Sequence, residues 1–485
     1  MALLDPATWE NKIAAGGWQT GGGGVLDVVE PATGHVLGHV GAATADDAYA
    51  AARRAAVAQR EWAAAPPEAR AAVLRRAGLL FEEHAAEIQR WIVRESGAIE
   101  PKAQLETHTA ASECFDASGL PHLGQGEVLL SDEARWSFAR RRPVGVVSVI
   151  APFNFPLILS IRAVAPALAC GNAVLLKPDP RTAVSGGVVL QRVFEEAGLP
   201  AGLLQTLPGG AEVGAAVVDA PEVGLIAFTG STAAGRRIGE AAGRLLKPAH
   251  LELGGNNALI VLPGADLDRA VSAAAFGSFM HQGQICMTTG RHLVHESLFD
   301  DYVEALADKA KNLPVGDPHT EPVALGPLID EQQAAHAQEL VDDAVDSGAR
   351  VAAGGSRSGL LFEPTVLTDL TPDTRAWKEE IFGPVAPVMS YATLDEAVDL
   401  ANACEYGLSI GILGPVGEAM KAADRLDSGK VHINEQTVSD ESAAPFGGTK
   451  DSGNGTRIGG MHNNLETFTE VQWLTVRPEI ADYPF

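Results

Sequence analysis

The sequence predicts an α/β protein: a doubly wound parallel sheet, a second α/β domain and a small projecting β arm. Three observations indicate this fold. Short apolar runs rich in β-branched residues alternate with stretches of helical length from residue 144, the alternation resumes after residue 264, and a strand pattern appears near the end of the chain. Apolar strands that do not alternate with polar residues are typical of a parallel sheet covered on both faces.

The first part of the chain is predicted to be helical. Residues 45–64 are rich in Ala and Arg, both of which favour helices. Pro66 and Pro67 end that segment, and residues 68–97 continue as one or two further helices. Gly97 is the expected C-cap.

The first α/β unit follows from residue 144. Strands are predicted at 144–152, 172–178, 203–209, 224–230 and 257–263. Helices are predicted between them, at 157–170, 182–197, 210–220 and 232–246. Sheets of this kind bind ligands outside the carboxyl ends of their strands.

The second unit and the arm complete the expected fold. Helices are predicted at 266–282, 298–312, 331–347 and 394–404. Strands are predicted near 291–295, 361–368, 386–390, 408–413 and 430–434. Residues 468–478 alternate as an edge strand that can pair with another subunit, and residues 133–143 form a second projecting strand.

Composition and charge exclude several classes of function. In 485 residues, 36 basic and 62 acidic side chains give a formal net charge of −26. This charge argues against nucleic acid or an anionic membrane surface as the main partner. The 46% hydrophobic content rules out intrinsic disorder. Neither a signal peptide nor an apolar run of 18 residues is evident in the sequence.

The four cysteines indicate reduced thiols. Cys114, Cys170, Cys286 and Cys404 are widely separated, with no CxxC pair and no zinc-ligand spacing. The sequence therefore predicts neither a disulfide framework nor a metal site. We expect a cytoplasmic protein.

Cys286 is the cysteine with a chemical context. It lies in SFMHQGQICMTTGR (278–291), where Gly283 and a polar run leave room for a ligand to approach. A thiolate there would be a strong nucleophile. The alternative is a buried structural cysteine, which is the commoner fate of a lone Cys and the interpretation we give the other three.

Two further side chains stand in unusual surroundings. Glu252 lies between two leucines before a Gly-Gly pair. An apolar setting raises the pKa of a carboxyl and suits a general base, whereas a helix-capping or ion-paired Glu is the plain alternative. Asn154 follows the strand predicted at 144–152. Its amide can stabilise an oxyanion, or the residue can simply form a turn.

A small-residue loop opens the helix predicted at 232–246. AFTGSTAAG (227–235) follows a predicted strand, and its glycines and hydroxyls suit phosphate approach at a helix N-terminus. The spacing of Gly230 and Gly235 is GxxxxG, which matches neither GxGxxG nor a P-loop. Alone, the signal is weak.

Taken together, these segments resemble the aldehyde dehydrogenase superfamily. Seven motifs occur in the family's order: PFNFP, KP, FTGST, ELGG, GQIC, EEIFGPV and PFGGTKDSG. Glu252 precedes Cys286 by the expected 34 residues, and the resemblance covers nearly the whole chain. His281 and residues 431–442 resemble the benzaldehyde and vanillin dehydrogenase branch. A structural role is expected for His281.

The resemblance implies a role for each matching residue. Cys286 would be the nucleophile, Glu252 the base that hydrolyses the thioester, and Asn154 an oxyanion donor. Residues implied in cofactor binding are Ile150, Ala151, Pro152, Phe153, Lys177, Gly210, Gly214, Phe228, Thr229, Gly230, Ser231, Thr232, Gly235, Leu253, Gly254, Glu380 and Phe382. Residues implied in contact with the substrate are Phe155, Ile285, Met287 and Phe446.

The resemblance also implies a domain plan and an assembly. The cofactor-binding domain would comprise residues 1–125 and 144–253, and the catalytic domain 254–454. Residues 126–143 and 455–485 would form an oligomerisation arm, giving a homodimer or homotetramer. The implied cofactor is NAD. Pro180 replaces the Glu that usually repels a 2′-phosphate and Arg181 follows it, so NADP also remains open.

The expected reaction is oxidation of a benzaldehyde-like aldehyde to the carboxylic acid. Phe153, Phe155, Ile285 and Met287 can form a slot for a flat ring, or they can simply pack the core. An aliphatic aldehyde or a semialdehyde is the alternative substrate, with Arg162 as a conceivable partner for a distal carboxylate. Glu252 disfavours a CoA-acylating enzyme. Retention of the three catalytic residues disfavours a non-catalytic binding protein on the same fold.

Overall fold

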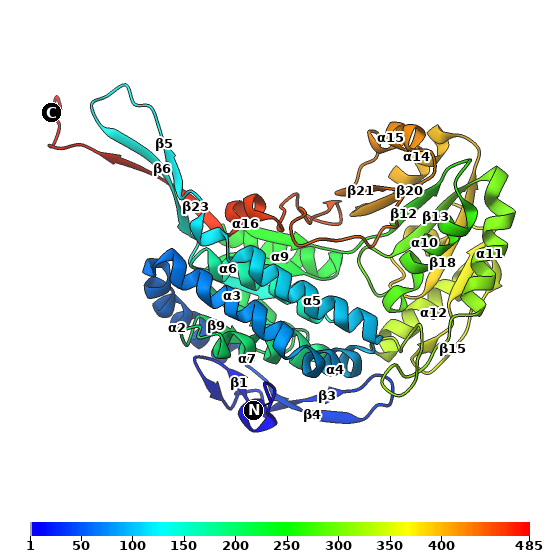
Figure 1. The fold of residues 1–485 in the computed structure, drawn as a ribbon, viewed down its shortest axis with the longest axis horizontal. Helices are drawn as coiled ribbons and strands as arrows, with labels where there is room; N and C mark the ends of the chain where they lie inside the picture. The colour runs from blue at the N-terminus through cyan, green and yellow to red at the C-terminus, as the bar shows by residue number, and fades with distance from the viewer. Residues whose placement is uncertain (1) are drawn as a thin grey trace.

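The computed structural model describes residues 2–485 and confirms the predicted α/β class (Figure 1). Within those residues the strands form two seven-stranded sheets, a three-stranded arm and three short two-stranded ribbons. The ribbons pair β3 (Val25–Val29) with β4 (Val36–Gly41), β15 (Arg357–Ser358) with β16 (Leu361–Phe362), and β19 (Tyr406–Gly407) with β22 (Thr449–Lys450).

The first large sheet has the strand order β11-β10-β7-β8-β9-β1-β2. Its strands are β1 (Ile13–Ala14), β2 (Trp18–Gln19), β7 (Val146–Ile150), β8 (Ala173–Lys177), β9 (Leu204–Thr206), β10 (Val223–Thr229) and β11 (Ala249–Glu252). Strands β11 to β9 are mutually parallel, and β1 and β2 close one edge in antiparallel pairing.

Helices cover both faces of this sheet because the chain crosses it in two directions. The connections through α6 (Pro156–Ala169) and α7 (Val189–Glu196) run from β7 to β9, whereas those through α8 (Ala211–Asp219) and α9 (Thr232–Leu245) run back. Right-handed crossovers therefore place the two pairs on opposite faces. The N-terminal helices are α1 (Pro6–Trp9), α2 (Ala45–Ala64), α3 (Pro67–Glu83), α4 (Ala85–Ser96) and α5 (Glu100–Ala117).

The second large sheet has the order β14-β17-β18-β13-β12-β20-β21. Its strands are β12 (Asn257–Val261), β13 (Thr289–His295), β14 (Arg350–Ala353), β17 (Thr365–Thr368), β18 (Val385–Tyr391), β20 (Ser409–Leu413) and β21 (Lys430–Ile433). Its helices are α10 (Leu267–Phe279), α11 (Phe299–Lys311), α12 (Glu331–Asp346), α13 (Arg375–Lys378), α14 (Leu394–Asn402) and α15 (Val416–Ala423). Separate hydrophobic cores lie against the two sheets.

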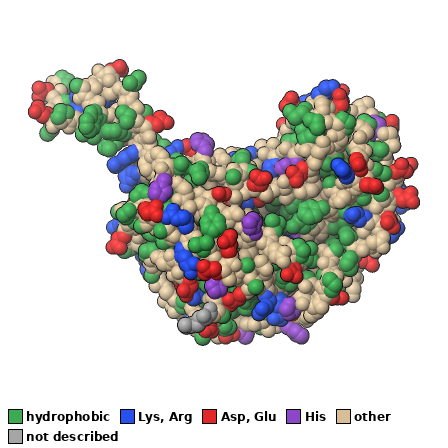
Figure 2. Space-filling view, viewed as in Figure 1, with side chains coloured by type: hydrophobic (Ala, Val, Ile, Leu, Met, Phe, Trp, Pro, Cys, Tyr) green, Lys and Arg blue, Asp and Glu red, His purple; other side chains and the backbone are tan. Residues whose placement is uncertain are grey.

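The arm is an antiparallel sheet that stands clear of the rest of the molecule, with the C-terminus beyond its outer end (Figure 1). It comprises β5 (Gly126–Val128), β6 (Trp136–Pro143) and β23 (Thr469–Val476), and α16 (Met461–Phe468) leads into it. Trp136 is 72% exposed and Trp473 is 64% exposed. Hydrophobic side chains are visible along the arm in Figure 2. Large exposed apolar patches of this kind mark contact surfaces.

Three sequence-based expectations need correction. The strand predicted at 257–263 forms β12, but it belongs to the second sheet, and the strand that completes the first sheet is β11, which was not predicted. The helix predicted at 182–197 begins as a π-helical turn over 184–188. The helix predicted at 266–282 ends at Phe279, because His281 and Gln282 adopt left-handed backbone conformations with φ of 48° and 56°.

Candidate active site

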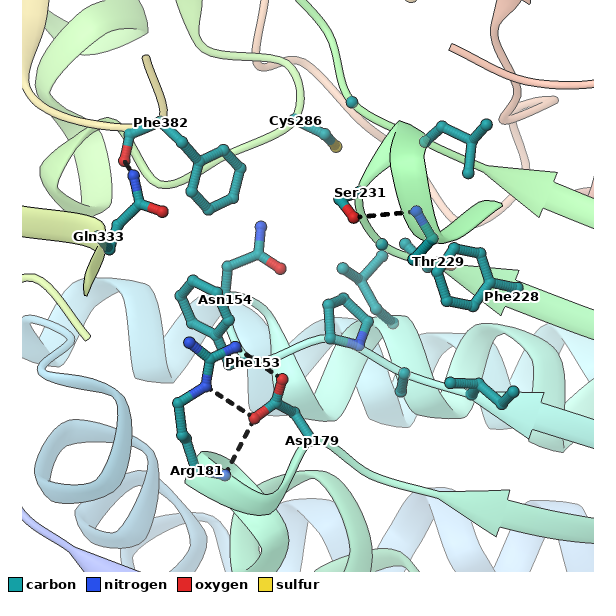
Figure 3. A pocket seen from close by; sticks show the side chains of 18 of the residues that line it. Phe153, Asn154, Asp179, Arg181, Phe228, Thr229, Ser231, Cys286, Gln333 and Phe382 are labelled. Atoms are coloured by element: carbon teal, nitrogen blue, oxygen red, sulfur yellow. Dashed lines mark hydrogen bonds and ion pairs between the residues drawn. The ribbon is translucent and has the colours of Figure 1, made fainter. Parts of the chain in front are cut away.

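Two cavities meet at Cys286. The larger, of about 590 Å³, extends over the carboxyl ends of β7, β8 and β10 (Figure 3). The second has a volume of about 240 Å³ and is also lined by Cys286. Asn154, Leu159 and Cys286 line both cavities. A reagent in each cavity would therefore lie next to the same cysteine.

The loop that carries Cys286 is anchored by two glutamines that precede the cysteine. Gln282 donates to the carbonyl oxygens of Gly97 and Pro327 at 2.9 and 2.8 Å. The side-chain oxygen of Gln284 accepts from the backbone N–H of Ile329 at 3.0 Å. These two glutamines fix a segment whose left-handed backbone conformations are strained for residues other than glycine.

The Cys286 thiol is neutral at rest. Burial raises its pKa to about 12, and the nearby carboxyls of Glu252 and Glu380 raise it further while Lys430 opposes them. Because the thiolate is the nucleophile, the proton must leave during the reaction.

Asn154 is held rigidly beside Cys286 on the loop after β7. Its side chain is buried, and Nδ2 donates one hydrogen bond to the carbonyl oxygen of Gln284 at 2.9 Å. Its backbone carbonyl accepts a hydrogen bond from the Lys102 ammonium at 2.7 Å. A side-chain amide carries two N–H donors, so Asn154 keeps one for an oxygen atom bound at the thiol.

Lys102 and Glu106 support this loop and were missed by the sequence analysis. They form a fully buried ion pair on α5, and the Glu106 carboxylate accepts from the backbone N–H groups of Leu157 and Ile158 at 3.0 and 3.3 Å. Those N–H groups lie in the first turn of α6, where helices lack internal partners. A Lys and a Glu four residues apart look like an exposed helical pair, so the sequence gives no signal of this role.

His281 packs in the same region. It is buried with its ring edge-on to Phe155, the ring centroids being 5.5 Å apart. Burial lowers its pKa well below the usual value, and the charge of Lys102 lowers it further. The imidazole is therefore neutral.

Glu252 is the last residue of β11 and is 3% exposed. Burial raises the pKa of its carboxyl to about 8, against the charges of Arg457, Lys430 and Arg162 and the backbone N–H of Gly448. The N–H of Gly448 lies near the carboxyl without forming a well-aligned hydrogen bond, and within residues 2–485 neither carboxyl oxygen has a partner at hydrogen-bonding geometry. Glu252 therefore ends a strand and caps no helix, and among the described residues no Lys or Arg side chain pairs with it.

The large cavity collects most residues implied in cofactor binding. Those that line it are Ile150, Ala151, Pro152, Phe153, Lys177, Phe228, Thr229, Gly230, Ser231, Leu253, Gly254, Glu380 and Phe382. Ser231 is the N-cap of α9, so the N-terminus of that helix faces the cavity. Free N–H groups at a helix N-terminus favour anions.

Four implied cofactor residues lie outside the lining of this cavity: Gly210, Gly214, Thr232 and Gly235. Thr232 donates to the carbonyl oxygen of Asp451 at 3.1 Å. A Cβ at Gly235 would lie 2.2 Å from the Leu253 side chain, so this glycine lets α9 approach the residue that follows β11.

Glu380 lines the large cavity, and the ELGG turn holds its side chain in place. Its carboxylate accepts from the backbone N–H of Gly255 at 3.0 Å, and a Cβ at Gly254 would lie 2.3 Å from the same carboxylate. Burial raises the pKa of Glu380 to about 7. Phe382, with φ of 53°, meets Phe153 across the cavity, with ring centroids 5.9 Å apart.

Arg181 and Asp179, whose ion pair is drawn in Figure 3, line the large cavity together with Asp330. Arg181 donates to both oxygens of Asp179, at 2.9 and 2.8 Å, and to Asp330 at 2.6 Å. The guanidinium also lies over the ring of Phe153, 4.2 Å from its centroid. Burial alone would raise the pKa of the Asp179 carboxyl. The hydrogen bonds from Arg181 outweigh the effect of burial and hold this pKa below its usual value. Arg181 is thus already paired with two carboxylates.

The smaller cavity has an apolar body and an ionic wall. Phe155, Ile158, Ile285, Met287 and Phe446 belong to one buried cluster that lines it. Arg162, Asp440 and Ser439 also line it.

The charge of Arg162 is neutralised within that wall. Its guanidinium donates to Glu113 at 3.1 Å and to Asp440 at 2.5 Å. The guanidinium carbon lies 4.7 Å from the Phe446 ring centroid.

Residues 2–485 include no group of His, Cys, Asp or Glu side chains that could hold a metal ion. In the same range, no helix combines the length and hydropathy needed to cross a membrane.

Comparison with known proteins identifies the family of the chain. Residues 18–474 match the model of the aldehyde dehydrogenase family. A vanillin dehydrogenase of Amycolatopsis sp. is 59% identical over 486 residues, which cover 100% of both chains. A benzaldehyde dehydrogenase (NAD+) of Pseudomonas putida is 48% identical over 479 residues, which cover 98% of both.

Solved structures agree with these matches. The crystal structure of an E. coli enzyme described as NADP dependent has a TM-score of 0.93 at 32% identity, covering 98% of this chain and 99% of that one. The family model spans nearly all of the sequence, and the fold is that of the solved relatives. The chain is an enzyme that belongs to the aldehyde dehydrogenase family.

Proposed function

We propose that this enzyme oxidises aromatic aldehydes to carboxylic acids, using NAD and a thioester on Cys286. The observation that carries the proposal is the position of Cys286 between a cavity suited to a dinucleotide and an apolar cavity suited to a ring. The vanillin and benzaldehyde dehydrogenases to which the chain is similar support the substrate class.

In this scheme the Cys286 sulfur attacks the aldehyde carbon as the thiol proton passes to a water molecule and on to the solvent. The carbonyl π electrons move to oxygen, and the free N–H of Asn154 stabilises the resulting oxyanion. A bound nicotinamide supplies the hydride acceptor. When the oxyanion re-forms the C=O bond, the hydride leaves the carbon and a thioester remains on Cys286.

Glu252 acts as the general base in hydrolysis of the thioester. Its carboxylate takes a proton from water and the hydroxyl oxygen bonds to the acyl carbon. The C–S bond then breaks, and the proton passes from Glu252 to the departing sulfur, which restores the thiol and the carboxylate and releases the acid. An apolar, water-poor setting raises the pKa of Glu252 to about 8, in the range that suits a general base near neutral pH.

The residues of the large cavity fit a dinucleotide. Glu380 and Lys177 offer a carboxylate and an ammonium for ribose hydroxyls, and the N-terminus of α9 offers N–H groups for the pyrophosphate. Phe382 packs beside the place expected for the nicotinamide. We propose residues 1–125 and 144–253 as the cofactor-binding domain and 254–454 as the catalytic domain.

We further propose NAD rather than NADP as the preferred cofactor. Pro180 cannot repel a 2′-phosphate, but the Asp179 carboxylate lies beside Lys177 and remains ionised. Arg181, the residue that could bind a phosphate, is paired with Asp179 and Asp330. The network therefore presents no uncompensated positive charge to a 2′-phosphate.

The variant Asp179→Asn tests this cofactor preference. Loss of the carboxylate removes repulsion and releases part of Arg181, so the NADP/NAD ratio of kcat/KM should rise about tenfold, equivalent to about 1.4 kcal/mol. The ratio is measured from reduced-cofactor formation with each dinucleotide. Glu331→Gln, which removes an exposed carboxylate paired with Arg357, is the matched control and should leave the ratio unchanged. An unchanged ratio in Asp179→Asn would contradict this role.

A flat ring is the substrate that the smaller cavity favours. Its body is formed by aromatic and aliphatic side chains, and the charge of Arg162 is already neutralised by Glu113 and Asp440. Arg162 therefore offers no free positive charge to the distal carboxylate of a semialdehyde.

Initial rates with benzaldehyde, vanillin, hexanal and succinic semialdehyde test the substrate class. The kcat/KM for the two aromatic aldehydes should exceed that for the other two by at least about tenfold, the value of one or two well-packed apolar contacts. A higher kcat/KM for hexanal or the semialdehyde would contradict the aromatic assignment while leaving the chemistry at Cys286 intact.

We also propose that the arm of residues 126–143 and 455–485 assembles the enzyme into a homodimer or homotetramer. The exposed tryptophans and the free edge of β23 support this role, because both are surfaces that another subunit can cover.

A further inference from the structure

A small enclosed cavity lies behind Glu252. Its volume is about 10 Å³, and Glu252, His250 and Arg162 line it together with apolar side chains that include Phe446 and Ile458. The three polar side chains are each at most 3% exposed. Among the described residues, both oxygens of Glu252, Nε2 of His250 and Nη1 of Arg162 have no hydrogen-bond partner. Buried polar atoms without partners are uncommon and call for an explanation.

Hydrogen bonds around Asn454 determine which nitrogen of His250 carries the proton. The side-chain oxygen of Asn454 accepts from the backbone N–H of Leu251 at 3.3 Å, and its Nδ2 donates to the carbonyl oxygen of Ala249 at 2.7 Å. The amide is therefore oriented with its oxygen toward Thr456, whose hydroxyl must donate to it, at 2.8 Å. A hydroxyl has only one hydrogen to donate.

The Thr456 oxygen must consequently accept from His250. The distance from Nδ1 of His250 to that oxygen is 2.8 Å, so Nδ1 carries the hydrogen. Burial lowers the pKa of His250 to about 3, and the charges of Arg457 and Arg162 lower it further. In the neutral ring, Nε2 then carries only a lone pair, and it lies 4.0 Å from Oε1 of Glu252.

The cavity thus offers one acceptor, His250 Nε2, and one donor, Arg162 Nη1. A protonated carboxyl also has one donor and one acceptor, whereas a carboxylate has only acceptors and would set a lone pair against that of Nε2. Closing the 4.0 Å separation by about 1 Å brings Oε1 and Nε2 to hydrogen-bonding distance, and the cavity leaves space for that movement.

We propose that neutral His250 accepts a hydrogen bond from the protonated carboxyl of Glu252 and thereby sets the pH at which Glu252 becomes the base. His250 is a positioning residue, since it acts through Glu252 and does not contact the substrate. The proposal rests on the proposed function, in which Glu252 hydrolyses the Cys286 thioester. The other charged or titratable groups that face Glu252 are Arg457, Lys430, Arg162 and Cys286.

The hydrogen bond to His250 raises the pKa of Glu252, because an acceptor stabilises the protonated form of the acid. Without this acceptor, Glu252 ionises at lower pH. The rate of thioester hydrolysis, which needs the carboxylate, would then reach its half-maximal value at lower pH.

The test follows loss of the acyl group from Cys286 in the full-length enzyme. The protein is acylated with p-nitrophenyl benzoate without cofactor, and the remaining acyl-enzyme is measured by mass spectrometry across a pH series. In His250→Phe, which keeps an aromatic ring but removes the acceptor, the midpoint of the pH dependence should fall by about one pH unit.

Thr456 provides a matched pair that leaves His250 in place. Thr456→Val removes the acceptor for Nδ1–H, which frees the hydrogen to move to Nε2 and donate toward the carboxylate, so the midpoint should also fall. Thr456→Ser keeps the hydroxyl and should retain the wild-type midpoint. These two variants test the role of His250 even if His250→Phe does not fold.

The outcomes separate the two proposals. An unmoved or raised midpoint in Thr456→Val, with wild-type enzyme acylated at Cys286, overturns the role of His250 alone. A wild-type enzyme that is never acylated at Cys286 overturns the proposed function, and the role of His250 with it.

Discussion

Replacing Cys286 by alanine is expected to lower aldehyde oxidation by about four orders of magnitude or more, the loss typical of a missing nucleophile. In residues 2–485, no other cysteine lines either of the two cavities that meet at this position. Cys114 and Cys170 lie outside both cavities, so neither thiol can reach an aldehyde bound there. The measurement is the initial rate of reduced-cofactor formation with benzaldehyde.

Binding of the cofactor should survive this change, because the Cys286 side chain touches only one end of the large cavity. Quenching of tryptophan fluorescence by NAD measures that binding. Cys404→Ala is the matched control: Cys404 lies outside both cavities and should keep activity within about twofold of wild type. Turnover retained in Cys286→Ala would show that another group is the nucleophile.

Replacing Glu252 by glutamine should slow thioester hydrolysis by about 10²- to 10⁴-fold, the usual contribution of a general base. Formation of the thioester does not need Glu252 in the proposed scheme. Rapid mixing with benzaldehyde and NAD should therefore show one equivalent of reduced cofactor per active site, followed by little further turnover. If that first equivalent is also lost, Glu252 acts earlier, in removing the thiol proton.

The same assignment predicts how the wild-type rate depends on pH. The folded-state pKa of Glu252 is raised to about 8, and the carboxylate is the active form, so the hydrolysis rate should rise with pH through about 8 and then level off. The rise should be absent from Glu252→Gln, which has no titrating carboxyl at this position.

Much of the fold could be predicted because its signals are local. Apolar β-branched runs located β7, β8, β9 and β10, and helix-forming stretches located α2 and α6 to α9. The segment before Glu252 was missed as a strand because HLELGG is short and joins directly to a Gly-Gly turn. Assignment of β12 to the second sheet depends on pairing with β13 and β20, which no local pattern reveals.

Within the candidate site, the motifs located residues that lie in sequence next to recognisable turns. Cys286 and Asn154 follow such turns, and Glu252 precedes the Gly-Gly turn. Lys102 and Glu106 could not be found in this way, because they act on Asn154 and α6 from a helix about 50 residues away.

The environment of a charged residue was also beyond local patterns. Arg181 looked free to meet a phosphate, but Asp179 is two residues away in sequence and Asp330 lies in a distant segment, and both pair with it. No local pattern singled out His250. Its significance depends on Thr456 and Asn454, which reach it only through the fold.

The mass of the acyl-enzyme tests the central claim most directly. Glu252→Gln is mixed with benzaldehyde and NAD, and the intact protein and its peptides are analysed by mass spectrometry. The account predicts one benzoyl group per chain, on the peptide that contains Cys286, and none when NAD is omitted. A protein that remains unmodified with NAD, or one that carries the benzoyl group on another residue, would contradict the proposed thioester chemistry.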